Sequence, residues 1–158
     1  MKFFVKKEDL YNGIKLVERA TSMKALQPVL LNIYIETIDK GTIKLVATDL
    51  DLTVIALVDA QVEEEGKITL PSKTLNEIVS KLGDKLITFE MKPDETSVNI
   101  TCQNSKFDII GISANEFPPE VNFPGNSVLY QLYTSGSTGV PKGVAITRDN
   151  LNCFARWM

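Results

Sequence analysis

The chain has 158 residues, of which 44% are apolar and 23% are charged, and its formal net charge is −3. This composition is ordinary for a globular protein, and neither a membrane span nor a secretory start is present. The chain has no histidine, and its two cysteines, Cys102 and Cys153, fit neither a disulfide framework nor a metal site. We therefore expect a cytoplasmic protein that has one domain, with or without an appendage.

The charges are spread unevenly along the chain. Residues 1–24 contain six basic and three acidic side chains, whereas residues 45–65 contain six acidic side chains and no basic one. A mildly acidic protein can bind nucleic acid when its basic residues gather on one face. Any contact with DNA would therefore depend on how the fold places the lysines and arginines.

An internal repeat with an offset of about 65 residues runs through the first 123 residues. Its apolar positions are Val5, Leu10, Ile14 and Val17, which reappear as Leu70, Leu75, Val79 and Leu82. Each set predicts the end of a strand followed by a short amphipathic helix. Acidic residues in "KKED" favour a helix start there, and so do Pro71 and Ser72 in "PSKTLNEIVSKL".

Strand-like runs follow each predicted helix. The first run contains a hairpin with its turn at 39–41, and the second has turns at 93–95 and at 104–105. Alternation in "SVNITC" places Val98 and Ile100 on one face of a strand. The order of strand, helix and hairpin thus occurs twice, through duplication or because α+β domains reuse similar strings.

The composition changes at "NEFPPEVNFPGNS", which is rich in proline and typical of a linker. We place the domain boundary here, with a first domain at 1–123 and an appendage at 124–158. In the appendage, "VLYQLY" predicts a strand, and "VAITRDNLNCFARWM" predicts a short strand and a helix capped by Thr147 or Asp149. Because the chain ends inside that helix and exposes aromatic surface, we expect truncation, with partial disorder or self-association.

Residues 1–121 resemble the N-terminal domain of the bacterial sliding clamp, the β subunit of DNA polymerase III. The similarity lies in "MKFFVKKEDLYNGIKLVERA", "QPVLLNIYIE", "LVATDLDLTV", "ITLPSKTLNEIVSKL" and "FPPEV". It implies an α+β fold, a single DNA-clamp domain with two strand–helix–hairpin units and with the helices on one face of an antiparallel sheet. It also implies a DNA replication processivity factor that encircles duplex DNA without catalysis, so we expect no enzyme activity and no cofactor.

The resemblance and the helical wheel suggest four residues for DNA contact. Lys24 and Lys73 match positions where the family commonly places a basic residue near DNA. Lys15 and Arg19 lie opposite the apolar Ile14 and Val17 on the wheel of the first helix, together with Asn12 and Glu8. An ordinary solvated surface is the alternative for all four.

Other clamp domains are the second partner that the resemblance implies. Phe107 and Ile109 in "SKFDIIGI" match apolar positions of the ring interface, where an edge strand would meet the neighbouring subunit. A strand in the core is the alternative. The family's second and third domains are not in this sequence, so we expect contacts with DNA polymerase III and the clamp loader only through a full-length clamp.

The acidic stretch "TDLDL" places Asp49 and Asp51 on one face of a strand. Two carboxylates without further oxygen ligands make a poor metal site. We therefore expect no metal here.

Residues 128–151 resemble the phosphate-binding signature of adenylate-forming (AMP-binding) enzymes. The matching residues are Thr134, Ser135, Gly136, Ser137, Thr138, Gly139, Pro141, Lys142 and Gly143. Glycines let backbone N–H groups approach phosphates, hydroxyls add donors, and Lys142 adds positive charge. The spacing excludes a Walker A loop. ATP and Mg²⁺ would bind only if the segment belonged to a complete adenylation domain, so we expect no adenylation by this chain.

Three interpretations remain open. The first is a sliding-clamp fragment with a foreign tail. The second is a truncated adenylate-forming enzyme with a clamp-like N-terminus. The third is a hybrid reading frame, from rearrangement or assembly error, with no selected activity.

Overall fold

The computed structural model describes residues 1–21, 27–50, 52–93, 95–118, 128–134 and 142–147. The chain divides into two units, 1–118 and 119–158. The domain boundary that we predicted at 123/124 lies outside the described residues, and so does the predicted helix after Thr147.

The first unit repeats one order of elements. Its first half contains β1 (Lys2–Lys6), α1 (Lys7–Val17), β2 (Asn32–Thr37), β3 (Thr42–Thr48) and β4 (Thr53–Glu64). Its second half contains β5 (Lys67–Pro71), α2 (Ser72–Lys81), β6 (Leu86–Met91), β7 (Ser97–Cys102) and β8 (Ser105–Ile110). Short 3-10 helices lie at Glu18–Ala20 (η1), Pro28–Leu31 (η2) and Ala114–Glu116 (η3). The predicted α+β fold with two similar halves is confirmed.

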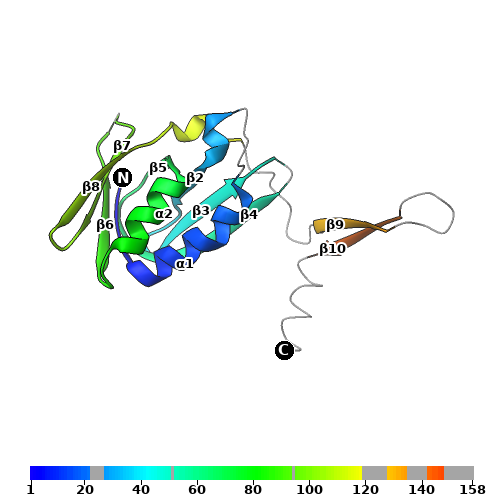
Figure 1. Cartoon of the computed structure of the whole chain (residues 1–158), viewed down its shortest axis with the longest axis horizontal. Coiled ribbons are helices and arrows are strands. Elements are labelled where there is room, and N and C mark those ends of the chain that lie inside the picture. Colours follow the sequence, from blue (N-terminus) through cyan, green and yellow to red (C-terminus); the bar gives the residue numbers. More distant parts are fainter. Residues whose placement is uncertain (22–26, 51, 94, 119–127, 135–141, 148–158) are drawn as a thin grey trace. The chain divides into compact units, whose positions relative to one another are not determined.

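The eight strands form one antiparallel sheet in the order β5-β2-β3-β4-β1-β6-β7-β8. β4 is twelve residues long and joins the two halves, because it pairs with β3 and also with β1. The two ends of the sheet approach each other at a single bridge between Thr69 and Ile112. The sheet is therefore nearly closed, and both helices pack against it (Figure 1).

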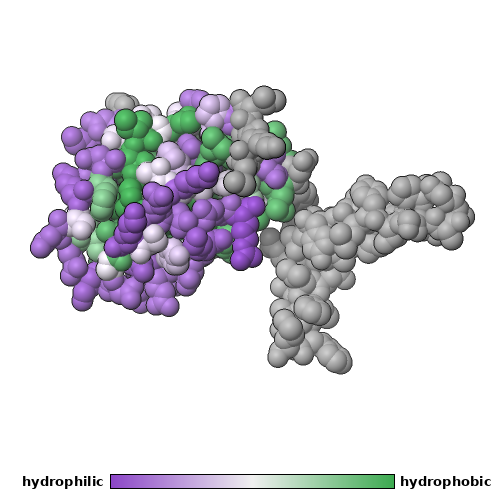
Figure 2. Space-filling view, viewed as in Figure 1, coloured by the Kyte–Doolittle hydropathy of each residue, from purple (hydrophilic) through white to green (hydrophobic). Residues whose placement is uncertain are grey.

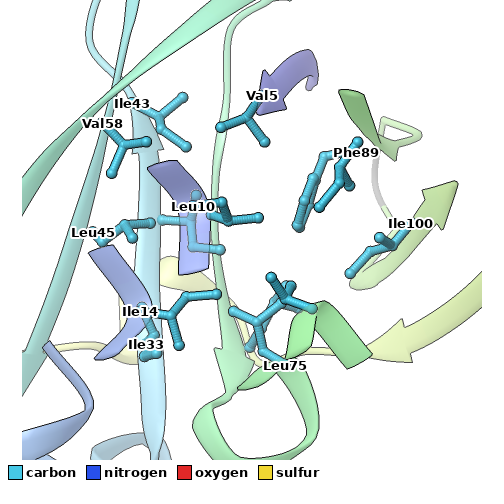
Figure 3. Close-up of a cluster of buried hydrophobic side chains, with 14 of the residues drawn as sticks. Val5, Leu10, Ile14, Ile33, Ile43, Leu45, Val58, Leu75, Phe89 and Ile100 are labelled. Atoms are coloured by element: carbon cyan, nitrogen blue, oxygen red, sulfur yellow. The ribbon is translucent and has the colours of Figure 1, made fainter. Parts of the chain in front are cut away.

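The core lies between the helices and the sheet. All eight apolar positions of the sequence repeat are buried, from Val5 to Leu82. Figure 3 shows Leu10 and Ile14 of α1, and Leu75 of α2, facing side chains of the surrounding strands. Phe3 and Phe89 stack with ring centroids 4.8 Å apart. Alternation in the strands and the helical period in α1 and α2 therefore supply one continuous apolar core.

The turns agree with prediction at two of three places. Asp39 accepts a hydrogen bond from Gly41 N–H at 2.7 Å in the turn between β2 and β3. β6 and β7 are joined through residues 92–96, as expected. The turn predicted at 104–105 is wrong by one residue: it lies at 103–104, because Ser105 pairs with Cys102 and belongs to β8. Gln103 adopts the left-handed φ of 52° that the tight turn needs.

In the second unit, β9 (Val128–Thr134) and β10 (Lys142–Thr147) form an antiparallel pair. Strands were predicted in both segments. The pairing places Thr134 opposite Lys142, at the two ends of the Gly/Ser/Thr segment.

Candidate nucleic-acid interface and sheet edges

The candidate DNA-binding surface is the side of α1 and α2 that faces away from the sheet. The two helices contact each other, and each buries its apolar side against the strands. Figure 2 shows mostly hydrophilic residues over both helices, in the same view as Figure 1. This surface is therefore formed by the exposed polar side chains of the two helices.

Three of the four predicted DNA-contact residues lie on this surface. Lys15 of α1, Arg19 of η1 and Lys73 of α2 are all exposed. Lys24 lies outside the described residues. Acidic side chains share the surface, because Glu8 of α1 and Glu77 of α2 are exposed as well. The surface therefore has mixed charge rather than a strong basic patch.

Lys15 already has two partners, each about one helical turn away along the chain. Its ammonium lies 3.3 Å from Glu18 Oε2 and 5.6 Å from the centre of the Tyr11 ring. The side-chain amide of Asn76 on α2 donates to both carboxylate oxygens of Glu18, at 3.0 and 3.1 Å. Glu18 thus links the end of α1 to α2 and partly neutralises Lys15. This link could not be predicted from the sequence, because Glu18 and Asn76 are 58 positions apart.

The outer side of the sheet carries separate ion pairs. Lys2 Nζ lies 3.0 Å from Glu63 Oε2, and this hydrogen bond, together with the charge of Glu63, raises the pKa of Lys2 above its ordinary value. Lys44 pairs with Glu36 at 2.8 Å on neighbouring strands. These lysines are held by carboxylates, so they contribute little free positive charge to a DNA surface.

The predicted interface residues lie on β8, the last strand of the sheet. β8 pairs with β7 on one side and has no second neighbour among the described strands. Ile109 is 4% exposed and belongs to the core, whereas Phe107 is 37% exposed. Ile110, which was not predicted, is 76% exposed. Its position beside Lys106 and Asp108 in the alternation of β8 could have revealed it.

A second open edge lies in the first half of β4. Residues 53–59 pair with β3 and with no other strand in the described part of the chain, while β1 pairs with 60–64. Ile55 and Leu57 are 48% and 68% exposed on this segment. The sequence does not reveal this edge: "TVIALVDA" is apolar on both faces, a pattern typical of strands whose faces are covered, and it carries no information on which backbone edge is paired.

Asp49, which we predicted on a strand, lies instead in the loop between β3 and β4, where it has a structural role. Its Oδ1 accepts the Leu52 N–H at 2.7 Å and shapes the loop between β3 and β4. Leu50 in this loop has a φ of 80°, which is unusual for a leucine. Asp51 lies outside the described residues, and the absence of a metal stays a prediction.

Residues 1–122 match the family model described as the N-terminal domain of the DNA polymerase III beta subunit. The chain belongs to this family. The resemblance that we stated for residues 1–121 is thereby confirmed for the clamp part, while no comparison supports the adenylate-forming signature.

Individual clamps agree with this assignment. The beta sliding clamp of Synechocystis sp. is 40% identical over 124 residues, which cover 75% of this chain and 32% of that protein. The clamp of Synechococcus elongatus is 37% identical over 121 residues. The chain therefore spans about a third of the length of the curated relatives that it matches.

Solved clamp structures show the same fold. A DNA polymerase III beta subunit structure from Eubacterium rectale gives a TM-score of 0.75 at 30% identity, over 85% of this chain and 35% of that chain. The sliding clamp of Caulobacter crescentus gives 0.73 at 27% identity, with the same coverage. The Helicobacter pylori clamp, solved with a DNA ligase peptide, gives 0.72 at 28% identity, over 78% of this chain and 34% of that chain.

No described helix has the length and apolar character needed to cross a bilayer.

Proposed function

We propose that this chain acts as the N-terminal module of a replication sliding clamp, which holds duplex DNA without catalysis. Family membership together with the helix pair carries the proposal, because the exposed sides of α1 and η1 and of α2 present Lys15, Arg19 and Lys73. Phosphate contacts of this kind position a protein on DNA without reading its sequence. The substrate class is therefore duplex DNA of any sequence.

The charge of the helix surface predicts weak binding by the isolated module. If about three phosphates are neutralised, log K falls with log salt with a slope of about −2.7. A fourfold rise in salt, from about 50 to 200 mM, then lowers the affinity about 40-fold. Persistence on DNA would have to come from enclosure by several modules rather than from this surface alone.

The open edges of β8 and of the first half of β4 support the proposed assembly into a ring. β8, with Phe107 and Ile109, offers one edge to a neighbouring clamp domain, and residues 53–59 of β4 offer another. Unpaired edges are sites at which a sheet can be extended by another chain or domain. Replicative polymerase and clamp loader would be reached only through the completed clamp.

Salt-dependent binding to a short duplex tests the DNA contact. Lys73→Gln should weaken binding and reduce the magnitude of the salt slope by about one. The matched control is Lys40→Gln in the turn between β2 and β3, which removes the same charge from an exposed site off the helices. Equal slopes for both variants and the unmodified chain would exclude the helix surface as the DNA site.

Retention on circular DNA tests the assembly. The chain is mixed with intact clamp subunits, loaded on closed circles and washed at increasing salt. We expect retention that is lost when the circle is cut, because a ring slides off a free end. A folded chain that is never retained would remove the ring function and leave the fold assignment intact.

We also propose that residues 128–151 are derived from a phosphate-binding loop and have no adenylation activity in this chain. The pairing of Thr134 with Lys142 supports the first part, since it brings the ends of the Gly/Ser/Thr segment together on neighbouring strands. Formation of an acyl-adenylate from ATP by the purified chain would refute the second part.

A further inference from the structure

We propose that β8 is also a self-association site, at which two copies of this chain pair antiparallel around Phe107. This contact goes beyond the proposed ring, which needs a different clamp domain at the same edge. The open side of β8 supplies the backbone groups, and the order of its charges selects the partner and the register.

The hydrogen-bond pattern shows which backbone groups of β8 face the open edge. Gly111 N–H donates to Thr96 O at 2.8 Å, and hydrogen-bonded pairs alternate along an antiparallel ladder. The register of β7 and β8 then directs the N–H and C=O groups of Phe107 and Ile109 toward β7. Those of Lys106, Asp108 and Ile110 lie on the opposite side of β8 and can bind another strand. This free side ends at Ile110, because Ile112, the next residue with the same orientation, bonds Thr69 of β5.

One register satisfies both the backbone and the charges. If a two-fold axis passes through Phe107, Lys106 of one copy lies opposite Asp108 of the other, and the reverse pair forms as well. Both residues have outward backbone groups, so these two pairs are hydrogen-bonded pairs of the new ladder. Opposite charges directly across a ladder stabilise it. A strand whose charges complement its own reversed sequence fits a second copy of itself.

Neighbouring registers fail for physical reasons. An axis through Lys106 or through Asp108 places like charges directly opposite each other, which destabilises the pair. If the axis passes between two consecutive residues of β8, each residue with outward backbone groups lies opposite a residue of the other copy whose groups already bond to its own β7. No new hydrogen-bonded ladder can then form. Among the registers centred on the middle of β8, the one centred on Phe107 has neither defect.

The exposed apolar side chains fit the same arrangement. The two Phe107 rings meet at a non-hydrogen-bonded position, where the Cα atoms are about 4.5 Å apart and side chains are closest. Phe107 is 37% exposed in the single chain and would be covered there. Ile110, 76% exposed, lies diagonal to Lys106 of the other copy, whose aliphatic stem can cover it. Asn99 holds Asp108 in place through a 2.7 Å hydrogen bond to Oδ1.

The test is a charge-swap series on the full chain, with dissociation constants from analytical ultracentrifugation and folding checked by circular dichroism. Lys106→Asp and Asp108→Lys should each weaken the dimer at least about tenfold, because two attractive pairs become repulsive. The double variant K106D/D108K should restore the dissociation constant to within about threefold of the original. Lys40→Asp, the same charge change at an exposed residue in the turn between β2 and β3, is the control and should have no effect.

Mixing the two single variants gives the decisive measurement. Each repels itself, but in the mixture the acidic strand of K106D faces the basic strand of D108K. Both cross-strand pairs are then attractive again, so a mixed dimer should form. We expect the unmodified chain to dimerise with a dissociation constant of about 1–10 µM. A chain that stays monomeric at about 100 µM would therefore overturn the proposal. A dimer whose dissociation constant does not change in the charge-swap variants would also overturn it, and would place self-association in residues 124–158. A third refuting result is a dimer that the double variant does not restore, as expected if β8 pairs with β4 instead.

Discussion

Replacing Gly111 by alanine should open the place where the two ends of the sheet meet. A Cβ at this position would lie 2.4 Å from the backbone oxygen of Thr69 and 3.0 Å from side-chain atoms of Ile68 and Leu70. The glycine is required for space rather than for its backbone conformation, because its φ lies outside the left-handed region. Directly beside it, Thr69 and Ile112 exchange two backbone hydrogen bonds of 3.1 and 3.0 Å.

The expected loss follows from these contacts. Two backbone hydrogen bonds contribute about 1 kcal/mol each, and a clash with a rigid backbone atom costs about 1–3 kcal/mol more. Alanine also lowers the conformational entropy of the unfolded chain, which stabilises the folded state by about 0.5 kcal/mol. The Gly111→Ala variant should therefore lose roughly 3 kcal/mol of its free energy of unfolding, a large part of the stability of a small domain.

Urea unfolding followed by circular dichroism measures this loss. The control is Gly83→Ala, since a Cβ there would lie 3.6 Å from its nearest neighbour, an atom of the Gln103 side chain. The control should stay within about 0.5 kcal/mol of the unmodified chain. If Gly111→Ala unfolds at the same urea concentration as Gly83→Ala, the bridge between Thr69 and Ile112 does not stabilise the closed sheet.

Two further substitutions test the helices by the same unfolding assay. Gly13→Ala should lower the free energy of unfolding by about 1 kcal/mol, because a Cβ would lie 2.7 Å from Val58 Cγ2, and overpacking outweighs the gain in helix propensity. An equal or more stable variant would contradict this. Asn76→Ala should cost about 1–2 kcal/mol through its lost hydrogen bonds to the Glu18 carboxylate. Ser80→Ala, on the exposed side of the same helix, should cost much less; equal losses would show that the link is not stabilising.

Much of the fold could be predicted because its signals are local. The helical period of Leu10, Ile14 and Val17, and the two-residue alternation of Val98 and Ile100, correctly place these side chains in the core. The order of the strands could not be predicted in this way. β4 pairs with β3 in one half and with β1 in the other, and periodicity carries no information on such distant partners.

For the candidate site, too, local features could be predicted and tertiary contacts could not. Exposure of Lys15 and Arg19 follows from the wheel of one helix and is confirmed. The partners of these charges depend on tertiary packing, so the contact of Glu18 with Asn76 was not foreseen. The left-handed backbone at Gln103 also escaped prediction, because glutamine is not a usual residue for that conformation.

The two halves of the domain end in strands that correspond to each other but close the sheet differently. β4 continues past its pairing with β3 and forms a ladder with β1, whereas the chain after β8 meets β5 at one bridge. In each half, however, the last strand has a segment that pairs on one side only within the described residues. These segments are 53–59 of β4, which pairs with β3, and 105–110 of β8, which pairs with β7. A closed barrel would have no such edges. The internal repeat thus leaves an open edge in each half, which supports the proposed place of the module between two neighbours in a ring.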